Sequence, residues 1–281
     1  MRVVHTVAEL HKILLPYWRK GDPIGFAPTM GALHDGHCSL LRQSRADHNA
    51  LTIASIFVNP LQFGPGEDYD EYPRDLQNDV KIAREAGADL VFAPSVAEMY
   101  PRGFVTFVDM EKLTERLCGA HRPGHFKGVL TVVFKLFAVV RPNHAYFGQK
   151  DYQQSVIIQR MITDLNLDVK MHIMPIIREP DGLAMSSRNA YLGTKHRQEA
   201  LVLHQALDRA KELIGGGEKN VKKLQAEVRR LIGAVKGAKL DYVSIVHPET
   251  LEDVNDVSGK TVVLVAARFG KTRLIDNVIV D

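Results

Sequence analysis

The order of short apolar runs and helical stretches constrains the fold of this chain more than any other feature. Ile24 to Ala27 is an apolar run that ends at Pro28, and Leu51 to Val58 is stopped by Asn59-Pro60. Asp89 to Ala93 is a third short run, and a proline again follows it. Runs of this length, bounded by turn residues, predict buried strands. Because helical stretches separate them, they predict a parallel sheet with crossover helices.

The intervening stretches have the character of helices. Residues after His37 follow helical spacing, and Asp75 to Ala86 is a charged helical stretch that Gly87 closes as a C-terminal cap would. The same alternation continues with expected helices at Gly128 to Val139 and Tyr152 to Leu165, and with expected strands at Ala145 to Phe147 and Val169 to Ile177. The predicted class of this part is therefore α/β.

After Arg188 the order of elements changes. Two long amphipathic helices are expected first, and strands follow them instead of alternating with them. A second, smaller α+β domain is therefore predicted, with the boundary near residue 175. Its expected elements are helices at Lys195 to Ile214 and Val221 to Val235 and strands at Leu240 to Val246, Thr261 to Ala267 and Thr272 to Val280.

Composition excludes several classes of protein. The chain has 281 residues, of which 45% are hydrophobic and 25% charged, as in folded globular proteins of one or two domains. Apolar runs such as Val129 to Val140 are broken by a lysine and are too short to cross a bilayer. The first residues, Met-Arg-Val-Val-His-Thr, contain no apolar signal core. We therefore expect a soluble, cytoplasmic protein with no membrane partner.

Charge and cysteine content point away from two further classes. The net charge of +3 comes without any block of Lys or Arg, so we expect no nucleic-acid partner. The only cysteines, Cys38 and Cys118, lie far apart and form no Cys-x-x-Cys pair. Neither a disulfide framework nor a thiolate zinc site is expected from them.

The segment PTMGALHDGH, Pro28 to His37, lies where the first strand ends and the next helix begins. Ligands of open parallel sheets bind at the carboxyl ends of strands, and the start of a helix suits phosphate. His34 and His37, with Gly36 allowing close approach, are placed to face a triphosphate and, when protonated, to offset charge on leaving pyrophosphate. Two other readings stay open for this motif alone: a zinc ligand pair, or two ordinary surface histidines.

The segment MSSRN, Met185 to Asn189, follows an expected strand and the turn Pro180-Asp181-Gly182. The hydroxyls of Ser186 and Ser187 and the guanidinium of Arg188 suit phosphate oxygens. The alternative is that a serine caps the following helix.

Two more segments at strand ends carry similar groups. In FGQKDYQQ, Lys150 suits a phosphate, and Asp151 suits either a ribose hydroxyl or a helix cap. In FVNPLQFG, Asn59 and Gln62 suit a hydroxy acid through neutral hydrogen bonds, or serve plain turn chemistry. Four such loops together predict an enzyme that uses ATP to activate a small carboxylic acid by adenylation.

Two alternative functions are compatible with the same loops. One is a nucleotidyltransferase that acts on a phosphorylated or nucleotide substrate. The other is a nucleotide sensor without turnover, which the presence of every expected polar residue disfavours.

Five motifs in order make the chain resemble the pantothenate synthetase (pantoate–β-alanine ligase) family over essentially its whole length. They are PTMGALHDGH, FVNPLQFG, RPGHFKGV (Arg122 to Val129), FGQKDYQQ and DGLAMSSRN. Two positions depart from the pattern: Cys38 stands where a larger apolar residue is expected, and Gln149 where glutamate is frequent. Neither has an expected chemical role.

The resemblance implies a fold and a reaction. The expected fold is a Rossmann-like parallel sheet with flanking helices at 1–175, which binds ATP and pantoate, and a smaller lid-like α+β domain at 176–281. Pantoate attacks the α-phosphorus of ATP with Mg²⁺, giving pantoyl adenylate and pyrophosphate. β-Alanine then attacks the acyl carbon, giving pantothenate, the vitamin B5 precursor of coenzyme A, and AMP. A cytoplasmic homodimer is also implied.

The resemblance also implies roles for individual residues. His34 and His37 contact phosphates, and His37 is the proton donor. Lys150, Ser186, Ser187 and Arg188 stabilise the leaving pyrophosphate, while Gln62 binds pantoate and β-alanine, with Gln154 and Asn59 as further substrate ligands. The Mg²⁺ ligands stay open, with Asp75, Asp79 and Asp89 as equal candidates. The residues implied to border ATP are Met30, Gly31, Ala32, Leu33, His34, Asp35, Gly36, His37, Gly148, Gln149, Lys150, Asp151, Ile177, Met185, Ser186, Ser187 and Arg188.

Overall fold

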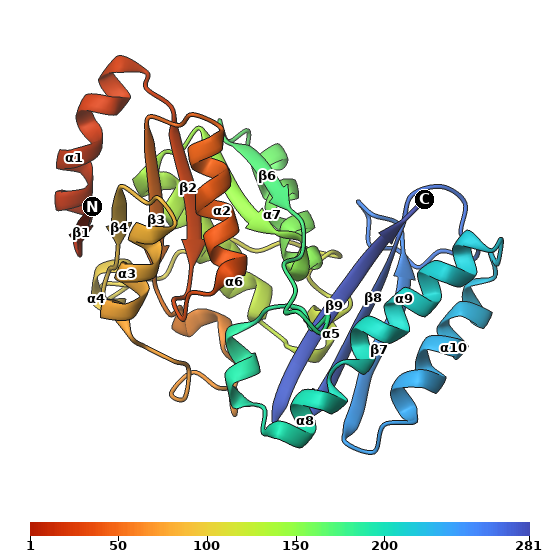
Figure 1. Cartoon of the computed structure of the whole chain (residues 1–281). Coiled ribbons are helices and arrows are strands. Elements are labelled where there is room, and N and C mark those ends of the chain that lie inside the picture. The colour runs from red at the N-terminus through yellow and green to blue at the C-terminus, as the bar shows by residue number, and fades with distance from the viewer.

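The computed structural model describes residues 1–281 and arranges them around two β-sheets (Figure 1). The first sheet has six parallel strands in the order β1-β4-β3-β2-β5-β6. The second has three antiparallel strands in the order β7-β8-β9. The expected fold class, a parallel sheet with flanking helices and a smaller α+β part, is confirmed.

The first sheet and its helices use residues 1–174. The strands are β1 (Arg2–Val4), β2 (Ile24–Thr29), β3 (Leu51–Ile56), β4 (Leu90–Phe92), β5 (His144–Gly148) and β6 (Lys170–Met174). The helices are α1 (Val7–Lys20), α2 (Asp35–Ala46), α3 (Leu76–Glu85), α4 (Val96–Met99), α5 (Cys118–His121), α6 (His125–Val140) and α7 (Tyr152–Asp164), with short 3₁₀ turns η1 (Pro60–Gln62) and η2 (Gln149–Asp151).

The elements that were not expected from the sequence include β1 and α1. β1 has only three residues, too few for a recognisable strand pattern. Helix α1 contains Pro16, a residue that normally argues against a helix interior. A capping box nevertheless starts it, because Thr6 accepts from the Glu9 amide and Glu9 accepts in return.

Helices cover both faces of the parallel sheet. Along β2, the fully buried Phe26 points into a core shared with α1, α6 and α7, while Ala27 points into the core beneath α2 and α3. This alternation is the period of two that every strand imposes on its side chains. Because helices cover both faces, β2 and β3 are buried along most of their length.

The order of the strands reverses at β2. From β2 the chain runs outward through β3 to β4, which pairs with the edge strand β1, and then returns to place β5 and β6 on the other side of β2. The carboxyl ends of β2 and β5 therefore flank a point where their following loops diverge. Such a switch point is where open parallel sheets bind ligands.

The second sheet is built from residues after 174. Its elements are η3 (Ser187–Tyr191), α8 (Thr194–Glu199), α9 (Val202–Gly215), α10 (Val221–Gly233), β7 (Ala238–Val246), β8 (Thr261–Phe269) and β9 (Thr272–Val280). The single helix expected at Lys195 to Ile214 is wrong. It is broken at Ala200 and Leu201, where the Leu201 amide donates to the Gln198 carbonyl. This bond spans three residues, as in a 3₁₀ turn, and not the four of an α-helix.

Each face of the second sheet packs on a different layer. Val243 and Ile245 of β7 belong to the core with α9 and α10. Val246 of β7 and Leu264 of β8 belong instead to the same apolar cluster as Phe126 of α6. The two sheets therefore share one of the apolar clusters, and the division of the chain near residue 175 stays a prediction.

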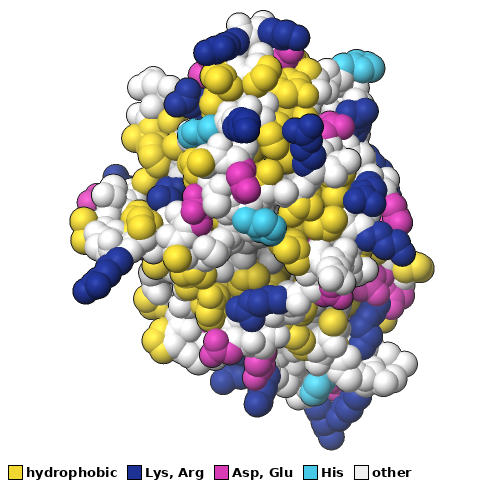
Figure 2. All heavy atoms as spheres, turned by 90° about the vertical axis from the view of Figure 1, so that its left-hand side faces the viewer, with side chains coloured by type: hydrophobic (Ala, Val, Ile, Leu, Met, Phe, Trp, Pro, Cys, Tyr) yellow, Lys and Arg dark blue, Asp and Glu magenta, His cyan; other side chains and the backbone are white.

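None of the helices combines the length and the apolar character that a membrane crossing needs. On the face around α1, Lys and Arg side chains are scattered among acidic and apolar ones (Figure 2).

Candidate active site

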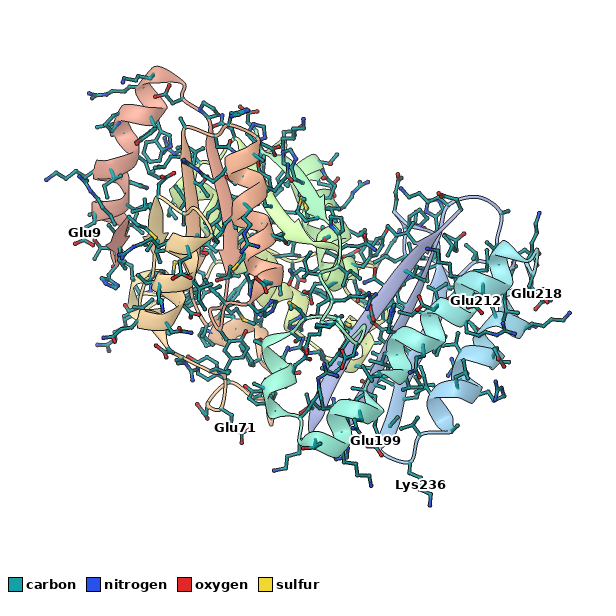
Figure 3. All side chains as sticks on the ribbon, viewed as in Figure 1. Glu9, Glu71, Glu199, Glu212, Glu218 and Lys236 are labelled. Carbon is teal, nitrogen blue, oxygen red and sulfur yellow. The ribbon has the colours of Figure 1, made fainter.

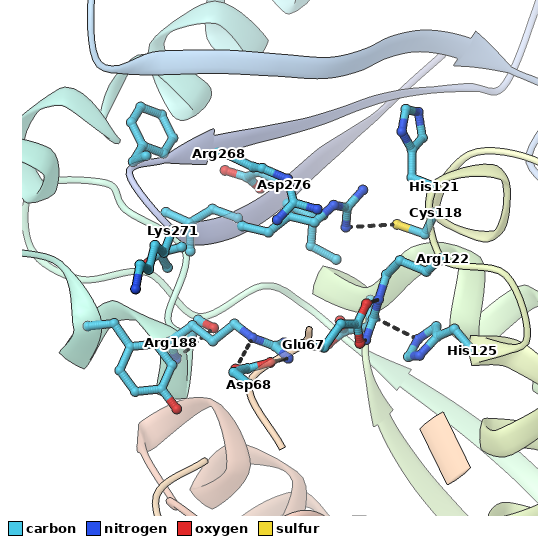
Figure 4. Close-up of a pocket in the computed structure, with 18 of the residues that line it drawn as sticks. Glu67, Asp68, Cys118, His121, Arg122, His125, Arg188, Arg268, Lys271 and Asp276 are labelled. Carbon is cyan, nitrogen blue, oxygen red and sulfur yellow. Dashed lines mark hydrogen bonds and ion pairs between the residues drawn. The ribbon is translucent and has the colours of Figure 1, made fainter. Parts of the chain in front are cut away.

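Two adjoining cavities lie at the carboxyl ends of the parallel strands. The inner cavity, of about 210 Å³, is lined by the ends of β2, β3 and β5 and by residues 175–177 and 185–188. The outer cavity, of about 1100 Å³, lies between this edge and the second sheet (Figure 4). Lys150, Gln154 and Arg188 line both. A site of this size accommodates a nucleotide with a small acid.

The structure brings most of the expected site residues to the inner cavity, but five of the expected ATP neighbours do not line it. Leu33 is buried in the core below the loop, and Asp35 faces Arg42 at 3.7 Å. Those that line the inner cavity are Met30, His34, Gly36, His37, Asn59, Gln62, Gly148, Lys150, Asp151, Gln154, Ile177, Met185, Ser186, Ser187 and Arg188; those that do not are Gly31, Ala32, Leu33, Asp35 and Gln149.

The loop before α2 is held in shape by Asp79 of α3. The buried carboxylate of Asp79 accepts hydrogen bonds from the backbone amides of Ala32 and Leu33, at 3.0 and 2.7 Å. Gly31 has a φ of +85°, and a Cβ there would lie 2.7 Å from the Asp79 carboxylate. Only glycine therefore fits at this turn. Burial raises the pKa of Asp79, although the two amide bonds act against that change.

The three carboxylates left open as Mg²⁺ ligands are all engaged elsewhere. Asp79 binds the loop backbone, Asp75 caps α3 through the Asn78 amide, and Asp89 binds Arg45 and the Thr52 amide. No group of three or more His, Cys, Asp or Glu side chains is arranged to hold a metal ion.

The rings of His34 and His37 lie against each other at the start of α2, with centroids 4.1 Å apart and planes inclined by 36°. The Gly36 amide donates to Nδ1 of His34 at 3.1 Å, and the His34 amide donates to Nδ1 of His37 at 3.3 Å. Because both Nδ1 atoms accept, each neutral ring carries its proton on Nε2. Both histidines therefore have an Nε2–H that is free of the cap.

Burial and positive neighbours keep both rings neutral. Desolvation, followed by the charge of Lys150, lowers the pKa of His34 to about 4. Desolvation, His34 and Lys150 hold the pKa of His37 well below its usual value. In the protein without ligand, these rings are therefore neutral hydrogen-bond donors. A bound triphosphate would oppose both causes and raise these pKa values.

The turn after β5 carries Lys150 and Asp151. The Lys150 ammonium lies 3.6 Å from the Asp151 carboxylate. Asp151 stands at the N-cap of α7 but makes no side-chain cap bond, so the capping alternative is wrong for it. Its carboxylate is half exposed and available to a ligand hydroxyl.

In the MSSRN segment, the capping alternative is correct for Ser186. Its hydroxyl accepts from the Arg188 amide at 3.3 Å at the start of η3. The Ser187 hydroxyl pairs with the Tyr72 hydroxyl at 3.0 Å. Capping and phosphate binding are compatible, because a hydroxyl that accepts from an amide still has its own proton to donate.

Two arginines of the site are paired with acidic residues of the loop at 64–75. Arg188 binds Asp68 through two bonds of 2.9 and 2.8 Å, and Arg122 binds Glu67 at 2.7 and 2.6 Å (Figure 4). Burial by itself raises the pKa of each carboxylate, but the arginines lower it overall. Glu71 lies at the exposed outer end of the same loop (Figure 3).

Arg122 and His125 were not assigned a role from the sequence. Arg122 donates to Nε2 of His125 at 2.9 Å, and Nδ1 of His125 donates to the Gln62 carbonyl at 2.7 Å. Burial and Arg122 lower the pKa of His125 to about 3, so the ring is neutral. Both residues belong to the motif RPGHFKGV, so this motif was the feature of the sequence that could have identified them as site residues. The acidic residues Glu67 and Asp68 carried no comparable signal.

Asn59 and Gln62 form one buried amide pair. Asn59 donates to Gln62 Oε1 and to the Gly128 carbonyl, both at 3.1 Å, and its own oxygen accepts from the Tyr100 hydroxyl. The Asn59 side chain is therefore fully used and orients Gln62. The Gln62 Nε2, directed at the sulfur of Met30 at 3.0 Å, has no strong acceptor and suits a polar substrate.

The fold and the site together define the class. A parallel sheet with a His-x-Gly-His loop, a lysine and an arginine at its strand ends is an α/β fold built to bind a nucleotide and a small acid.

Comparisons with known proteins narrow this class. The model of the pantoate-beta-alanine ligase family matches residues 2–279. Pantothenate synthetases of Acetivibrio thermocellus and Heliobacterium modesticaldum are 52% and 54% identical over all 281 residues and all of the relative. The chain belongs to the pantoate–β-alanine ligase family, as its motifs indicated.

Solved structures agree with this assignment. The pantothenate synthetase of Thermus thermophilus has a TM-score of 0.94, with 49% identity and 99% of each chain covered. A pantoate-beta-alanine ligase of Francisella tularensis has a TM-score of 0.82 and 35% identity, with 99% of this chain and 97% of that chain covered. That ligase is described as complexed with beta-gamma ATP and beta-alanine.

Proposed function

We propose that this chain condenses pantoate with β-alanine to pantothenate at the expense of ATP, and so serves the synthesis of vitamin B5 and coenzyme A. One observation carries the proposal within the family: the His-x-Gly-His loop, Lys150, the MSSRN segment and the Asn59–Gln62 pair all line one inner cavity. Phosphate-binding groups and neutral amides for a hydroxy acid are thereby brought together.

In the first step, a carboxylate oxygen of pantoate attacks the α-phosphorus of ATP. The bond between the α-phosphorus and the bridging oxygen breaks, giving pantoyl adenylate and pyrophosphate. The Nε2–H groups of His34 and His37, with Lys150, Ser186, Ser187 and Arg188, are proposed to stabilise the charge that moves onto pyrophosphate. Proton donation by His37 requires the triphosphate to raise its pKa, because the free ring is neutral.

In the second step, the amine of β-alanine attacks the acyl carbon of the adenylate. The bond to the AMP phosphate breaks, and the ammonium proton that the nucleophile loses leaves to solvent or to a phosphate. Gln62, oriented by Asn59, is proposed to hold pantoate and then β-alanine, with Gln154 as a further ligand. The apolar walls of the inner cavity keep water from the adenylate, which hydrolyses readily.

We propose that Mg²⁺ arrives with ATP as part of the substrate. The chain presents no preformed group of metal ligands, and the candidate carboxylates Asp75, Asp79 and Asp89 are used elsewhere. Mg²⁺ is commonly held by substrate phosphates and water with few protein ligands, so these residues fit an ion that enters as Mg·ATP.

The working state is proposed to be a homodimer in the cytosol, where ATP is supplied. The β6 edge of the parallel sheet has no neighbouring strand, and Ile173 on it is 44% exposed. An open edge of this kind favours pairing with a second copy. Sedimentation equilibrium tests the state, and a monomer at micromolar concentration would contradict it.

ATP–pyrophosphate exchange tests the reaction. Purified protein with Mg²⁺ is expected to exchange label only when pantoate is present, and to release AMP and pantothenate once β-alanine is added. Exchange at background with pantoate would contradict the proposed reaction. ATP binding without any exchange would favour a nucleotide sensor, and a dinucleotide product would favour a nucleotidyltransferase.

A further inference from the structure

Strand β9 of the second sheet carries a polar pair, Asp276 and Asn277, that is almost completely buried. Asp276 is 3% exposed and Asn277 is 2% exposed. β9 pairs only with β8, so its other edge is free to meet the first part of the chain. It contacts both η2 and η3, and it passes above the outer cavity (Figure 4). Because buried polar groups need partners, the partners of this pair reveal what it does.

The side-chain amide of Asn277 is bound to the turn that carries Lys150. Its Nδ2 donates to the carbonyl oxygens of Gln149 and Lys150, each at 3.0 Å. Its Oδ1 accepts from Nε2 of Gln149 at 3.1 Å. These bonds hold two consecutive residues of η2 immediately before α7. They therefore determine where the Lys150 side chain leaves the backbone.

The carboxylate of Asp276 holds the other phosphate-binding segment. It pairs with Arg178 through two bonds, of 2.7 and 3.0 Å, in the bidentate geometry. Arg178 also donates to the Gly182 carbonyl at 3.0 Å, and its backbone pairs with Ala184. This closes a small hairpin that leads directly into Met185. Asp276 accepts from the Asn277 backbone amide as well, at 2.8 Å, which links the two anchors.

Neighbouring residues on β9 thus fasten two loops that both line the inner cavity. The loops are far apart in the sequence, and their own hydrogen bonds do not connect them. The bonds from Asn277 go to backbone carbonyls, which water would otherwise satisfy at a turn. The hydrogen bonds of Asn277 fix the position of these carbonyl groups, because hydrogen bonds have a preferred geometry. An apolar side chain of similar size would only bury surface and would not fix that position.

We infer that Asp276 and Asn277 are positioning residues that set Lys150 and the Ser186–Arg188 segment at the mutual distance which a triphosphate requires. The inference rests on the proposed function, because it takes Lys150 to be a phosphate ligand. Both residues line the outer cavity and neither lines the inner one, so the inference assigns to β9 a share in ATP binding that is exerted through the two loops. In metal sites, groups that orient a ligating side chain change affinity about 10- to 100-fold when they are removed, and we expect an effect at the lower end of this range here.

A double-mutant cycle in nucleotide binding tests the inference. The four proteins are wild type, Asn277→Ala, Lys150→Ala and the double variant, and the probe is α,β-methylene-ATP with Mg²⁺ measured by calorimetry. We expect Asn277→Ala to weaken binding about tenfold in the wild-type background and less than about twofold in the Lys150→Ala background. The Asn277→Asp variant, which keeps the size but cannot donate to the carbonyls, is expected to resemble Asn277→Ala.

A matched control separates positioning from stability. Val280→Ala removes buried apolar atoms from the same strand, in the core shared with α9 and α10, and is expected to lower the unfolding temperature while leaving the affinity unchanged. Equal losses of affinity in both backgrounds, no loss in Asn277→Ala, or an equal loss in Val280→Ala would each overturn the inference.

The outcomes also distinguish this inference from the proposed function. Failure of pantoate-dependent exchange in the wild type would overturn the reaction, while the binding cycle would still show whether Asn277 acts through Lys150. A wild-type protein that binds no analogue would overturn the inference itself.

Discussion

At the residue scale, the site depends on how side chains are used before any substrate arrives. Asn59 uses all its hydrogen-bonding capacity on its neighbours, while the Nε2 of the adjacent Gln62 meets only a sulfur. His34 and His37 each use Nδ1 for the helix start and leave Nε2–H for a ligand. In His34, His37 and Gln62, one polar atom is held by a hydrogen bond within the protein. The other polar atom therefore points in a defined direction toward a ligand.

Gln62→Ala is expected to weaken pantoate binding strongly and to leave ATP binding nearly intact, because Gln62 lies on the η1 side of the cavity and the proposed ATP ligands lie on the other loops. A rise of at least about tenfold in the pantoate KM, with less than about a twofold change for ATP, is the expected kinetic result. Asn59→Ala is the companion variant and is expected to act in the same direction. Unchanged pantoate kinetics for Gln62→Ala would refute the assignment.

The lowered pKa of His34 predicts how stability depends on pH. The unfolded chain binds a proton to this ring below its ordinary pKa of 6.5, whereas the folded protein does so only near 4. The unfolding free energy therefore falls as the pH drops from about 6.5 toward 4. His34→Asn keeps an acceptor for the Gly36 amide but removes the titration. Its unfolding temperature is expected to depend less steeply on pH in this window, and parallel curves would contradict the assignment.

At the scale of elements, α3 supports the loop that carries the two histidines. Asp79 and Asp75 lie one turn apart at the start of this helix, yet only Asp79 reaches the loop backbone. The two carboxylates therefore form a natural pair for comparison. Asp79 is expected to contribute to both stability and nucleotide binding, and Asp75 to stability alone.

Asp79→Ala leaves two loop amides without an acceptor, which costs about 1–3 kcal/mol of unfolding free energy, and it is expected to weaken ATP binding. Asp75→Ala removes a helix cap and costs about 1 kcal/mol without changing ATP binding. Urea unfolding and ATP titration of both variants provide the measurement. Equal ATP affinities in the two variants would show that the loop holds its shape without Asp79.

At the scale of the whole molecule, the two sheets share an apolar cluster, so they are expected to unfold together. Leu264 of β8 is 4% exposed and lies in this shared cluster, and the only tryptophan, Trp18, lies in α1 of the first part. Leu264→Ala is expected to cost about 2–5 kcal/mol. The Trp18 fluorescence transition should shift together with circular dichroism. A Trp18 transition that stays unchanged while circular dichroism shifts would show that the parts unfold separately.

Local patterns predicted most of the elements and the positions of the polar loops. Both the periodicity of apolar residues and the turn residues are properties of short stretches of sequence. Local signals failed where tertiary contacts prevail. The three-residue β1 pairs with β4, and the helix after Lys195 breaks at the fully buried Ala200. The sequence by itself determined the family, the parallel sheet and the loops that carry polar residues.

Only the tertiary structure decided how those polar residues are used. It neutralised His34 and His37 by burial, committed Asp79 to backbone amides and paired Arg188 with Asp68. It also brought Asn277 to the Lys150 turn from a strand more than one hundred residues later. The physical reason is that solvation and hydrogen-bond partners depend on distances in space, and neighbours along the chain do not specify those distances.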